Sequence, residues 1–357
     1  MNNRAIIAMS GGVDSSVAAL IMKENGYDCI GVTMRLFSNE DIKVSNERTC
    51  CSLDDAEDAR AVARSLGIPH YVFNFSDKFK EYVIERFIYA YENGMTPNPC
   101  IDCNRYLKFD KMFLRAQELG CDRVVTGHYA RIEFDEKSGR YLLKKGSDPK
   151  KDQSYVLYSM TQEQLKHTIF PLGAMTKAQI RKIAEKNGFV NAKKHDSQDI
   201  CFVPDGKYAD FIERYTGRTY PEGDFIDISG HVLGRHKGII RYTVGQRKGL
   251  GLSMPEPVYV SKIDPLDNTV TLSKNSELFS NVLIAKNINL IPVKEITSPI
   301  RLTAKVRYRH PESPALVTQL DRDVIRVEFE TPQRAVTRGQ AVVLYDGDIV
   351  FGGGTIV

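Results

Sequence analysis

The chain has 357 residues, of which 42% are hydrophobic, and carries a formal net charge of +4 at pH 7. This length favours two or three domains over a single core. No biased tract or fixed-period repeat interrupts the sequence, which excludes a solenoid and a disordered chain. The mild charge points to no particular partner by itself.

The sequence indicates a protein of a reducing compartment. Residues 5–8 form an apolar run with no charged leader before it, and no uncharged stretch reaches the length of a membrane span. We therefore expect a cytoplasmic protein that does not bind a membrane. Seven cysteines are an odd number, which argues against a disulfide framework and favours thiol or metal chemistry.

The first 130 residues alternate strand-like apolar runs with helical patterns, which is typical of a doubly wound parallel α/β sheet. The predicted strands are 5–9, 29–34, 71–75 and 123–126, and the predicted helices are 17–25, 54–66, 79–93 and 110–119. Gly26 and Gly120 are predicted to end two of these helices. Ser52 with Asp55 resembles a capping box at the start of another.

The pattern of predicted secondary structure changes near residue 199. A short helix is predicted at 208–215, followed by β segments separated by Gly and Pro. Alternating segments at 302–308, 315–320, 324–329, 341–345 and 349–351 then predict a small β-barrel. We expect a catalytic α/β domain at 1–204, a small central domain at 205–280 and the barrel at 281–357.

A Ser/Gly-rich segment at residues 10–16 follows the first predicted strand and opens the first helix. Its glycines let the backbone approach a ligand, the helix N-terminus attracts phosphate oxygens, and the hydroxyls of Ser10, Ser15 and Ser16 add donors. The loop lacks the lysine of kinase-type phosphate loops and the spacing of dinucleotide-binding loops. A plain strand-to-helix turn is the alternative.

This segment, Ser-Gly-Gly-Val-Asp-Ser-Ser, resembles the SGGxDS loop of the ATP pyrophosphatase superfamily. The resemblance implies that ATP is cleaved between its α and β phosphates, which leaves an adenylated intermediate.

Three cysteines stand out. Cys100 and Cys103 lie in the segment 96–105, on a predicted loop near a helix start, where thiol pKa values would fall below the usual value of about 8.5. A redox pair, half a metal site and chance all fit this single CxxC. Cys201, in a polar run at 195–203, would bring a third thiol, and a zinc site is an alternative despite the lack of a second CxxC. The remaining cysteines are expected to be small packed residues, namely Cys29, Cys50, Cys51 and Cys121.

Over nearly its whole length, the sequence resembles the bacterial tRNA-specific 2-thiouridylases. Besides the two segments above, the resemblance rests on motifs at 126–131, 151–155, 242–251, 306–309 and 352–354. It implies an N-terminal phosphate-loop domain that binds ATP, a central domain and a C-terminal barrel that both contact tRNA.

The resemblance implies a two-step reaction. The C2 carbonyl oxygen of a wobble-position uridine attacks the α-phosphorus of ATP, used with Mg²⁺, and sulfur then displaces AMP to leave 2-thiouridine. Cys201 would receive a persulfide from a donor protein, either a cysteine desulfurase or a relay protein. Cys103 would be the nucleophile that releases this sulfur by forming a disulfide with Cys201.

The resemblance also assigns binding residues. Those implied for ATP are Ala8, Met9, Ser10, Gly11, Gly12, Val13, Asp14, Ser15, Ser16, Met34 and Gly127, and Asp14 also counts as catalytic. Those implied for the anticodon arm of tRNA are Asn98, Pro99, Cys100, His128, Lys151, Asp152, Gln153, Arg307, Tyr308 and Gln340. A base must leave its stack to be modified, and basic residues with a nearby aromatic ring suit that task. For Tyr308, a core or surface role is an equal alternative.

At Cys100 the sequence differs from reference members of the family that it resembles. Those members carry an aspartate with acid/base function at this position. Cys100 is then either the acid/base group or, together with Cys103 and Cys201, a ligand of a [4Fe-4S] cluster with one open iron. Two other functions compete. A different ATP pyrophosphatase, acting on a small-molecule amide or carboxylate, needs neither the three thiols nor a basic barrel, and a non-enzymatic RNA-binding module leaves the phosphate loop without a purpose.

Overall fold

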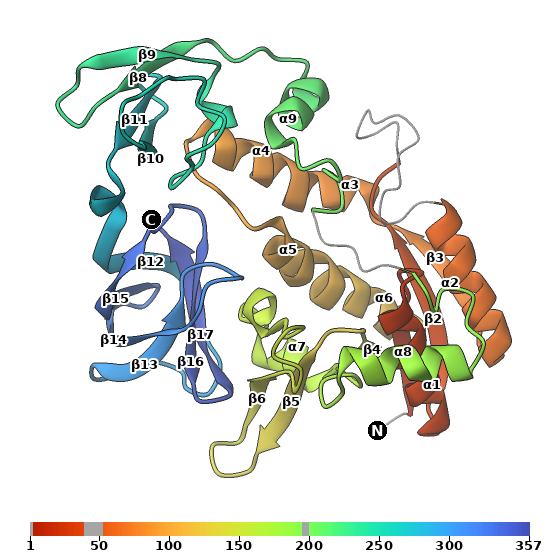
Figure 1. The fold of residues 1–357 in the computed structure, drawn as a ribbon. Helices are drawn as coiled ribbons and strands as arrows, with labels where there is room; N and C mark the ends of the chain where they lie inside the picture. Colours follow the sequence, from red (N-terminus) through yellow and green to blue (C-terminus); the bar gives the residue numbers. More distant parts are fainter. Residues whose placement is uncertain (1–2, 39–52, 195–199) are drawn as a thin grey trace. The chain divides into compact units, whose positions relative to one another are not determined.

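The computed structural model describes residues 3–38, 53–194 and 200–357 (Figure 1). They form two compact units, each assembled from separate stretches of chain. Unit 1 comprises Met1–Val83, Cys100–Gly206 and Asp348–Phe351. Unit 2 comprises Ile84–Pro99, Lys207–Gly347 and Gly352–Val357.

Unit 1 is built on a five-stranded parallel sheet with the strand order β3-β2-β1-β4-β7. The strands are β1 (Arg4–Ala8), β2 (Asp28–Arg35), β3 (His70–Asn74), β4 (Arg123–Val125) and β7 (Thr168–Ile169). The helices α1 (Val13–Glu24), α2 (Leu53–Leu66) and α8 (Lys177–Lys186) share one core cluster with this sheet. Ile7, Val17, Ala63 and Ile180 are fully or almost fully buried in it. The predicted doubly wound α/β class is therefore confirmed.

The start of the first helix differs from the predicted one. The helix α1 begins at Val13, four residues early, because Gly12 takes an extended conformation at its N-cap. Gly26 and Gly120 have φ values of 78° and 68°, as expected for glycines that follow helix ends. The predicted capping box of Ser52 with Asp55 lies outside the described residues, because Ser52 is not among them.

The segment that carries Cys100 and Cys103 is helical, so the predicted loop at 96–105 is wrong from Pro99 onward. The helix α5 (Pro99–Asp102), a π-helical stretch (Cys103–Lys111) and α6 (Met112–Glu118) follow one another without a break. Proline suits the first turn of a helix, where its missing N–H has no partner to lose. An earlier run combines α3 (Ser76–Phe79), a π-helical turn (Lys80–Ile84) and α4 (Glu85–Glu92).

A hairpin, a 3₁₀ turn and one short helix are further elements of unit 1. The hairpin, which the sequence patterns did not predict, joins β5 (Ala130–Asp135) to β6 (Arg140–Lys145), and Ile349 of β17 (Ile349–Ile356) pairs with Lys144. A 3₁₀ turn (Ser154–Leu157) and α7 (Gln162–Lys166) follow. Thr161 and Thr176 form capping boxes that start α7 and α8.

Unit 2 contains the helix α9 (Tyr208–Thr216), which is followed in the sequence by a small sheet. The sheet has the order β10-β11-β8-β9, with β8 (Gly223–Ile226), β9 (Val232–His236), β10 (Tyr259–Asp264) and β11 (Thr269–Ser273). One 3₁₀ turn, Ile239–Arg241, lies between β9 and β10 in the sequence, and another, Asn275–Leu278, follows β11. The rings of Phe225, His236 and Tyr242 pack edge to face in the core of this sheet.

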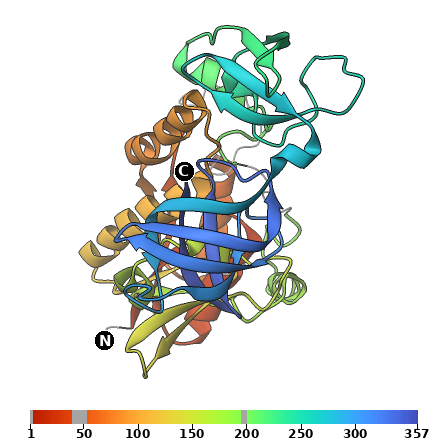
Figure 2. The same ribbon diagram turned by 90° about the vertical axis from the view of Figure 1, so that its left-hand side faces the viewer.

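The predicted β-barrel is present in unit 2 and is closed (Figure 2). Its order is β12-β15-β14-β13-β16-β17, and β12 also pairs with β17. The strands before β17 are β12 (Phe279–Leu290), β13 (Ile300–Lys305), β14 (Ser313–Asp321), β15 (Val324–Arg334) and β16 (Ala341–Asp346). The sequence patterns missed β12. The inward faces of the strands carry Val317, Val327 and Leu344, which are fully buried.

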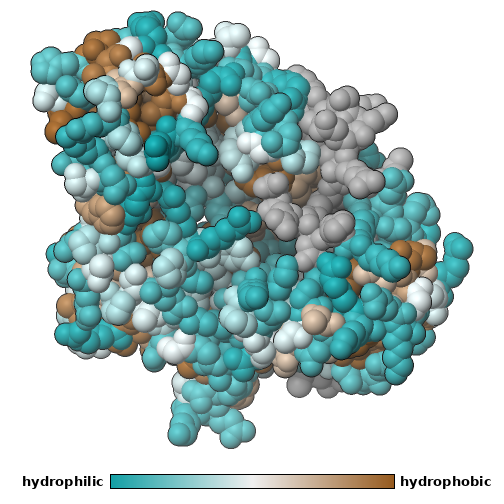
Figure 3. All heavy atoms as spheres, in the orientation of Figure 1, coloured by the Kyte–Doolittle hydropathy of each residue, from teal (hydrophilic) through white to brown (hydrophobic). Residues whose placement is uncertain are grey.

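Hydrophilic residues predominate on the face shown in Figure 3, and hydrophobic ones appear there in small groups. Among the described helices, none has the length and hydrophobicity that crossing a membrane requires.

We predict that Leu344→Ala destabilises the barrel by about 2–5 kcal/mol, because it removes a fully buried side chain from a packed core. Urea unfolding followed by circular dichroism measures the shift. Leu320→Ala is the control, since Leu320 is 55% exposed and its loss should change stability little. Equal effects of the two substitutions would contradict the barrel core described above.

Candidate functional site

The Ser/Gly-rich segment forms a tight loop between β1 and α1 that is held by its own side chains. The Ser10 backbone N–H donates to Ser15 Oγ at 3.2 Å, and the hydroxyls of Ser15 and Ser16 both donate to the Gly12 carbonyl at 3.0 Å. Ser15 and Ser16 are buried, whereas Ser10 is exposed. Two of the three hydroxyls expected to bind phosphate thus donate within the loop, and their contact with phosphate stays a prediction.

Residues of α2 and of the segment that follows α8 contact the loop. Gly11 has a φ of 72°, and a Cβ there would lie 2.2 Å from the Asp55 carbonyl oxygen. Asn191 Nδ2 donates to the Gly11 carbonyl and to Ser16 Oγ, each at 2.9 Å. Lys194 Nζ donates to Asp55 at 2.6 Å and to Asp58 at 2.7 Å. The sequence patterns did not single out Asn191, and they marked Lys194 only as part of a basic cluster with Lys193.

The residues expected to bind ATP gather at the carboxyl ends of three adjacent strands. Ala8 ends β1, Met34 lies near the end of β2, and Gly127 follows β4. A Cβ at Gly127 would lie 2.9 Å from the backbone of Asp14 and of Ser15, so only glycine permits this approach. In open α/β sheets, ligands bind outside the carboxyl ends of the strands.

Asp14, in the first turn of α1, is the most strongly held side chain of the loop. Tyr129 Oη donates to its carboxylate at 2.7 Å, and Lys177 Nζ lies 2.9 Å from both of its oxygens. The side chain of Lys177 is 11% exposed and that of Asp14 is 31% exposed. Sequence reasoning missed Lys177, since a lysine at a helix start gives no sign of a partner 163 residues away.

The motif at 151–155 holds the backbone of Tyr129, the residue that donates to Asp14. Gln153 brackets the backbone of Tyr129, because its N–H donates to the Tyr129 carbonyl at 2.9 Å and its Oε1 accepts from the Tyr129 N–H at 3.0 Å. Asp152 accepts from the Gly146 N–H and from the Ser154 hydroxyl. The side chains of Asp152 and Gln153, both expected to contact tRNA, thus make internal contacts.

His128 is buried between the rings of Phe109 and Phe170, and its Nδ1 lies 2.6 Å from Thr126 Oγ1. Burial lowers the pKa of His128 well below its usual range. The imidazole is therefore neutral at pH 7 and positions its loop; contact with tRNA stays a prediction.

The two thiols of the CxxC segment have different environments. Cys100 is exposed on α5, while Cys103, one helical turn later, is buried. Burial raises the pKa of the Cys103 thiol to about 11, with Lys108 acting in the opposite direction and the nearby Cys100 adding to the increase. The expected lowering of this pKa is therefore wrong for Cys103, because removal from water outweighs a position near a helix start. Cys201 is half-buried in a turn.

The described residues, which include all three of these cysteines, contain no group of three or more Cys, His, Asp or Glu side chains that could hold a metal ion. The [4Fe-4S] site expected at Cys100, Cys103 and Cys201 therefore does not fit this arrangement.

The expected RNA-binding residues of unit 2 make internal contacts. The Arg307 guanidinium donates to the carbonyls of Val244 and Ala335 at 3.1 and 2.7 Å and to Thr337 Oγ1 at 2.6 Å. Gln340 Nε2 donates to the Thr96 carbonyl at 2.8 Å, just before Asn98 and Pro99. Tyr308 is 37% exposed.

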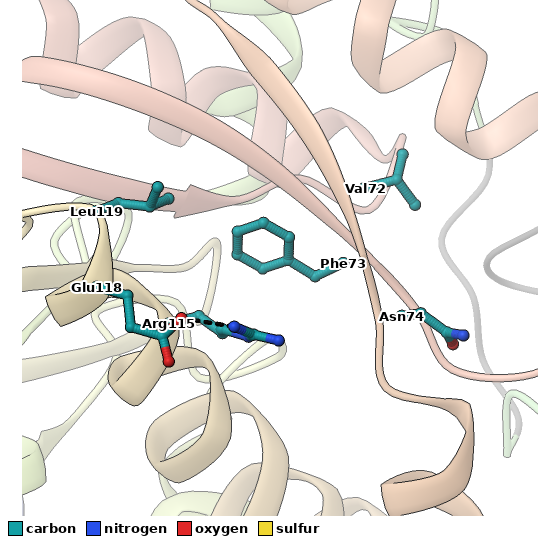
Figure 4. Close-up of a pocket in the computed structure, with 6 residues that line it drawn as sticks. All are labelled: Val72, Phe73, Asn74, Arg115, Glu118 and Leu119. Atoms are coloured by element: carbon teal, nitrogen blue, oxygen red, sulfur yellow. Dashed lines mark hydrogen bonds and ion pairs between the residues drawn. The ribbon is translucent and has the colours of Figure 1, made fainter.

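A hollow of about 380 Å³ lies elsewhere in unit 1 (Figure 4). Residues of the edge strand β3 and of α6 line it, with a 2.5 Å ion pair between Arg115 and Glu118. None of the residues expected to bind ATP or tRNA lines it.

Three family models match the chain in succession. They are the tRNA methyl transferase HUP domain at residues 3–205, the tRNA methyl transferase PRC-barrel domain at 209–274 and the aminomethyltransferase beta-barrel domain at 280–356.

Curated relatives match the chain over its full length. A tRNA-specific 2-thiouridylase MnmA of Clostridioides difficile (strain 630) is 51% identical and covers 100% of this chain and 98% of the relative. The protein of the same name from Clostridium acetobutylicum is 50% identical, with 100% coverage of both chains. A solved 4-thiouridine synthetase–RNA complex with bound ATP covers 56% of this chain and 45% of that one, at 21% identity and a TM-score of 0.38, which is too weak to carry an argument.

We predict that Gly11→Ala lowers stability clearly more than Gly26→Ala. Both residues have positive φ, which costs about 1–2 kcal/mol for alanine, but only the Cβ at position 11 also meets a backbone carbonyl, while position 26 has nothing within 4 Å. Urea unfolding of the two variants measures the difference. Equal losses would show that α2 does not approach the loop as described.

We also predict that Cys103 reacts slowly with iodoacetamide at neutral pH and faster as the pH rises toward its raised pKa of about 11, since only the thiolate reacts. Cys100, exposed on the same helical segment, is the internal reference and should be alkylated first. Mass spectrometry of peptides labelled at several pH values gives both rates. Rapid labelling of Cys103 at pH 7 would contradict its burial.

Proposed function

Because the chain belongs to the family of tRNA-specific 2-thiouridylases, we propose that it converts the wobble-position uridine of tRNA to 2-thiouridine in an ATP-dependent reaction. The observation that carries the proposal is the preformed loop of residues 10–16 at the carboxyl ends of β1, β2 and β4, in the same unit as Cys100, Cys103 and Cys201. An anion site and thiols are the two devices that adenylation and sulfur transfer need. Identity of 50–51% over the whole chain supports the same substrate.

In the proposed first step, ATP binds with Mg²⁺ at the loop. Backbone N–H groups around Gly11 and Gly12, with the N-terminus of α1, hold the phosphates, and the backbone near Met34 and Gly127 holds the adenosine. The remaining ATP contacts are those expected from the sequence, from Ala8 to Ser16. The uridine C2 oxygen attacks the α-phosphorus, and pyrophosphate leaves.

In the proposed second step, Cys201 carries a persulfide delivered by a donor protein, a cysteine desulfurase or a relay protein. The Cys103 thiolate attacks the Sγ of Cys201, so that a disulfide forms and the terminal sulfur leaves as hydrosulfide. Hydrosulfide attacks C2 of the adenylated uridine and displaces AMP. An external thiol then reduces the disulfide and restores both cysteines.

Cys100 is proposed as the proton carrier of this step. Cys103 is protonated at neutral pH because of its raised pKa, so it must lose a proton before it attacks. Cys100 is exposed and interacts with Cys103, one helical turn away. The proposed step uses no iron–sulfur cluster, because the described residues include no group of three cysteines placed to bind one.

We propose that the residues contacting the anticodon arm of tRNA include Asn98, Pro99, Lys151, Arg307, Tyr308 and Gln340. The internal bonds of Arg307 and Gln340 suggest that they act largely by fixing their surroundings. We also propose that the domains meet at residues 204 and 280. A further part of the proposal is that the protein acts in the cytoplasm.

The test uses the purified protein, an unmodified tRNA transcript, ATP and a persulfide donor. Nucleoside mass spectrometry should detect 2-thiouridine, and AMP should form in an equal amount. The formation of both products should require the tRNA. AMP formation that depends instead on a small-molecule amide or carboxylate would favour the other ATP pyrophosphatase activity. RNA binding without AMP formation would favour the binding module.

Within this assay, Cys201→Ser should abolish 2-thiouridine while pyrophosphate is still released, because activation precedes sulfur delivery. Cys121→Ser is the matched control, since Cys121 is a buried cysteine beside the opposite, amino end of β4. It should retain thiolation. Full 2-thiouridine formation by Cys201→Ser would remove Cys201 from the mechanism.

A further inference from the structure

A negative side chain in a phosphate-binding loop needs a counter-charge. Asp14 lies in the first turn of α1, two residues after Gly12, and part of its carboxylate surface is exposed. Like charges repel each other, and the repulsion is stronger where the protein excludes water than it is in bulk water. An unpaired Asp14 carboxylate would therefore repel the phosphates of ATP strongly.

Two cations approach the loop among the described residues, and they differ in what neutralises them. Lys194 Nζ, 3.4 Å from the Gly11 carbonyl, is shared by the carboxylates of Asp55 and Asp58. That group carries a net negative charge and offers no positive charge to a phosphate. Lys177 Nζ bonds both oxygens of Asp14, and its side chain is almost buried.

On this basis we infer that Lys177 supplies the counter-charge that keeps the Asp14 carboxylate from repelling the phosphates, and that Lys177 and Tyr129 are positioning residues that fix this carboxylate for ATP binding. The inference rests on the proposed ATP-dependent function and adds two residues to its ATP site. Kinase-type loops carry a lysine that reaches the phosphates, whereas here the lysine comes from the start of α8 and neutralises a carboxylate of the loop.

The backbones of both positioning residues are held by one segment, 148–153. Asp148 Oδ2 accepts from the Lys177 N–H at 3.0 Å, which fixes the first residue of α8. Gln153 brackets the backbone of Tyr129 with two hydrogen bonds. Such a supported arrangement keeps the two donors in place before ATP arrives, so little ordering is needed on binding.

The first experiment compares Lys177→Met with Lys144→Met by equilibrium binding of ATP and of adenosine, without tRNA. Lys144 is a close match, since its side chain is 16% exposed and its Nζ lies 2.7 Å from Glu133 in the β5–β6 hairpin. Lys177→Met should weaken ATP binding by about tenfold or more and leave adenosine binding unchanged, because only ATP carries phosphates. Lys144→Met should bind both ligands like the wild type.

A second substitution separates charge from structure. In the Lys177→Met background, Asp14→Asn removes the uncompensated carboxylate, so ATP affinity should recover most of the loss. A merely structural role of Lys177 would give equal losses for ATP and adenosine and no recovery in the double variant, and either result would overturn the inference. Lys177→Arg, which keeps the charge, should bind ATP within a few-fold of the wild type.

The support from segment 148–153 is tested with Tyr129→Phe and Asp148→Ala. Each should weaken ATP binding several-fold and spare adenosine binding, although Asp148 touches only the backbone of Lys177 in the site. Asp135→Ala is the control for Asp148→Ala, because Asp135 also accepts backbone N–H groups, but in the hairpin turn. Wild-type ATP affinity of both test variants would remove Tyr129 and the segment from the inference.

The outcome is distinguishable from failure of the proposed function. If the wild-type protein does not bind ATP, the proposed function fails. If the wild type binds ATP and Lys177→Met binds it equally well, only the inference about Lys177 fails.

Discussion

The carboxylate of Asp14 joins three distant stretches of unit 1. It belongs to the loop after β1, its hydroxyl partner Tyr129 follows β4, and its cationic partner Lys177 starts α8. The close approaches at Gly11 and Gly127 leave this loop little room to move. A partly buried ion pair loses some of its hydration and is maintained when both charges have partners, which here fixes how α8 and the β4 loop pack against α1.

Periodicity predicted the fold well, because long apolar runs and Gly turns are local signals. The strands β1 to β4 were placed to within one or two residues, and the barrel was expected from the alternation in β13 to β17. The hairpin β5–β6 and the strand β12 were missed, since their partly exposed residues show weak alternation. The helix at Pro99 was missed because two nearby prolines indicate a loop, whereas one of them fits a helix start.

The sequence predicted those parts of the candidate site whose functional residues lie in one contiguous motif. The segment 10–16 and Gly127 fall together at the sheet edge as expected. The roles of Lys177, Asn191 and Lys194 depend on tertiary contacts, which spacing along the chain does not reveal. The pKa of Cys103 was misjudged for a related reason: nearness to a helix start can be read from sequence, but burial requires the surrounding fold.

Neither compact unit is a continuous piece of chain, which affects how this protein can fold during synthesis. Unit 1 takes residues 348–351 from β17, where Ile349 pairs with Lys144 of the hairpin, and unit 2 takes residues 84–99 from between two parts of unit 1. A ribosome-bound chain that ends at residue 206 therefore still lacks a segment of its nucleotide-binding unit. A fragment cut at that point would leave the edge of β6 without this strand partner, so it would be more prone to pair with other chains.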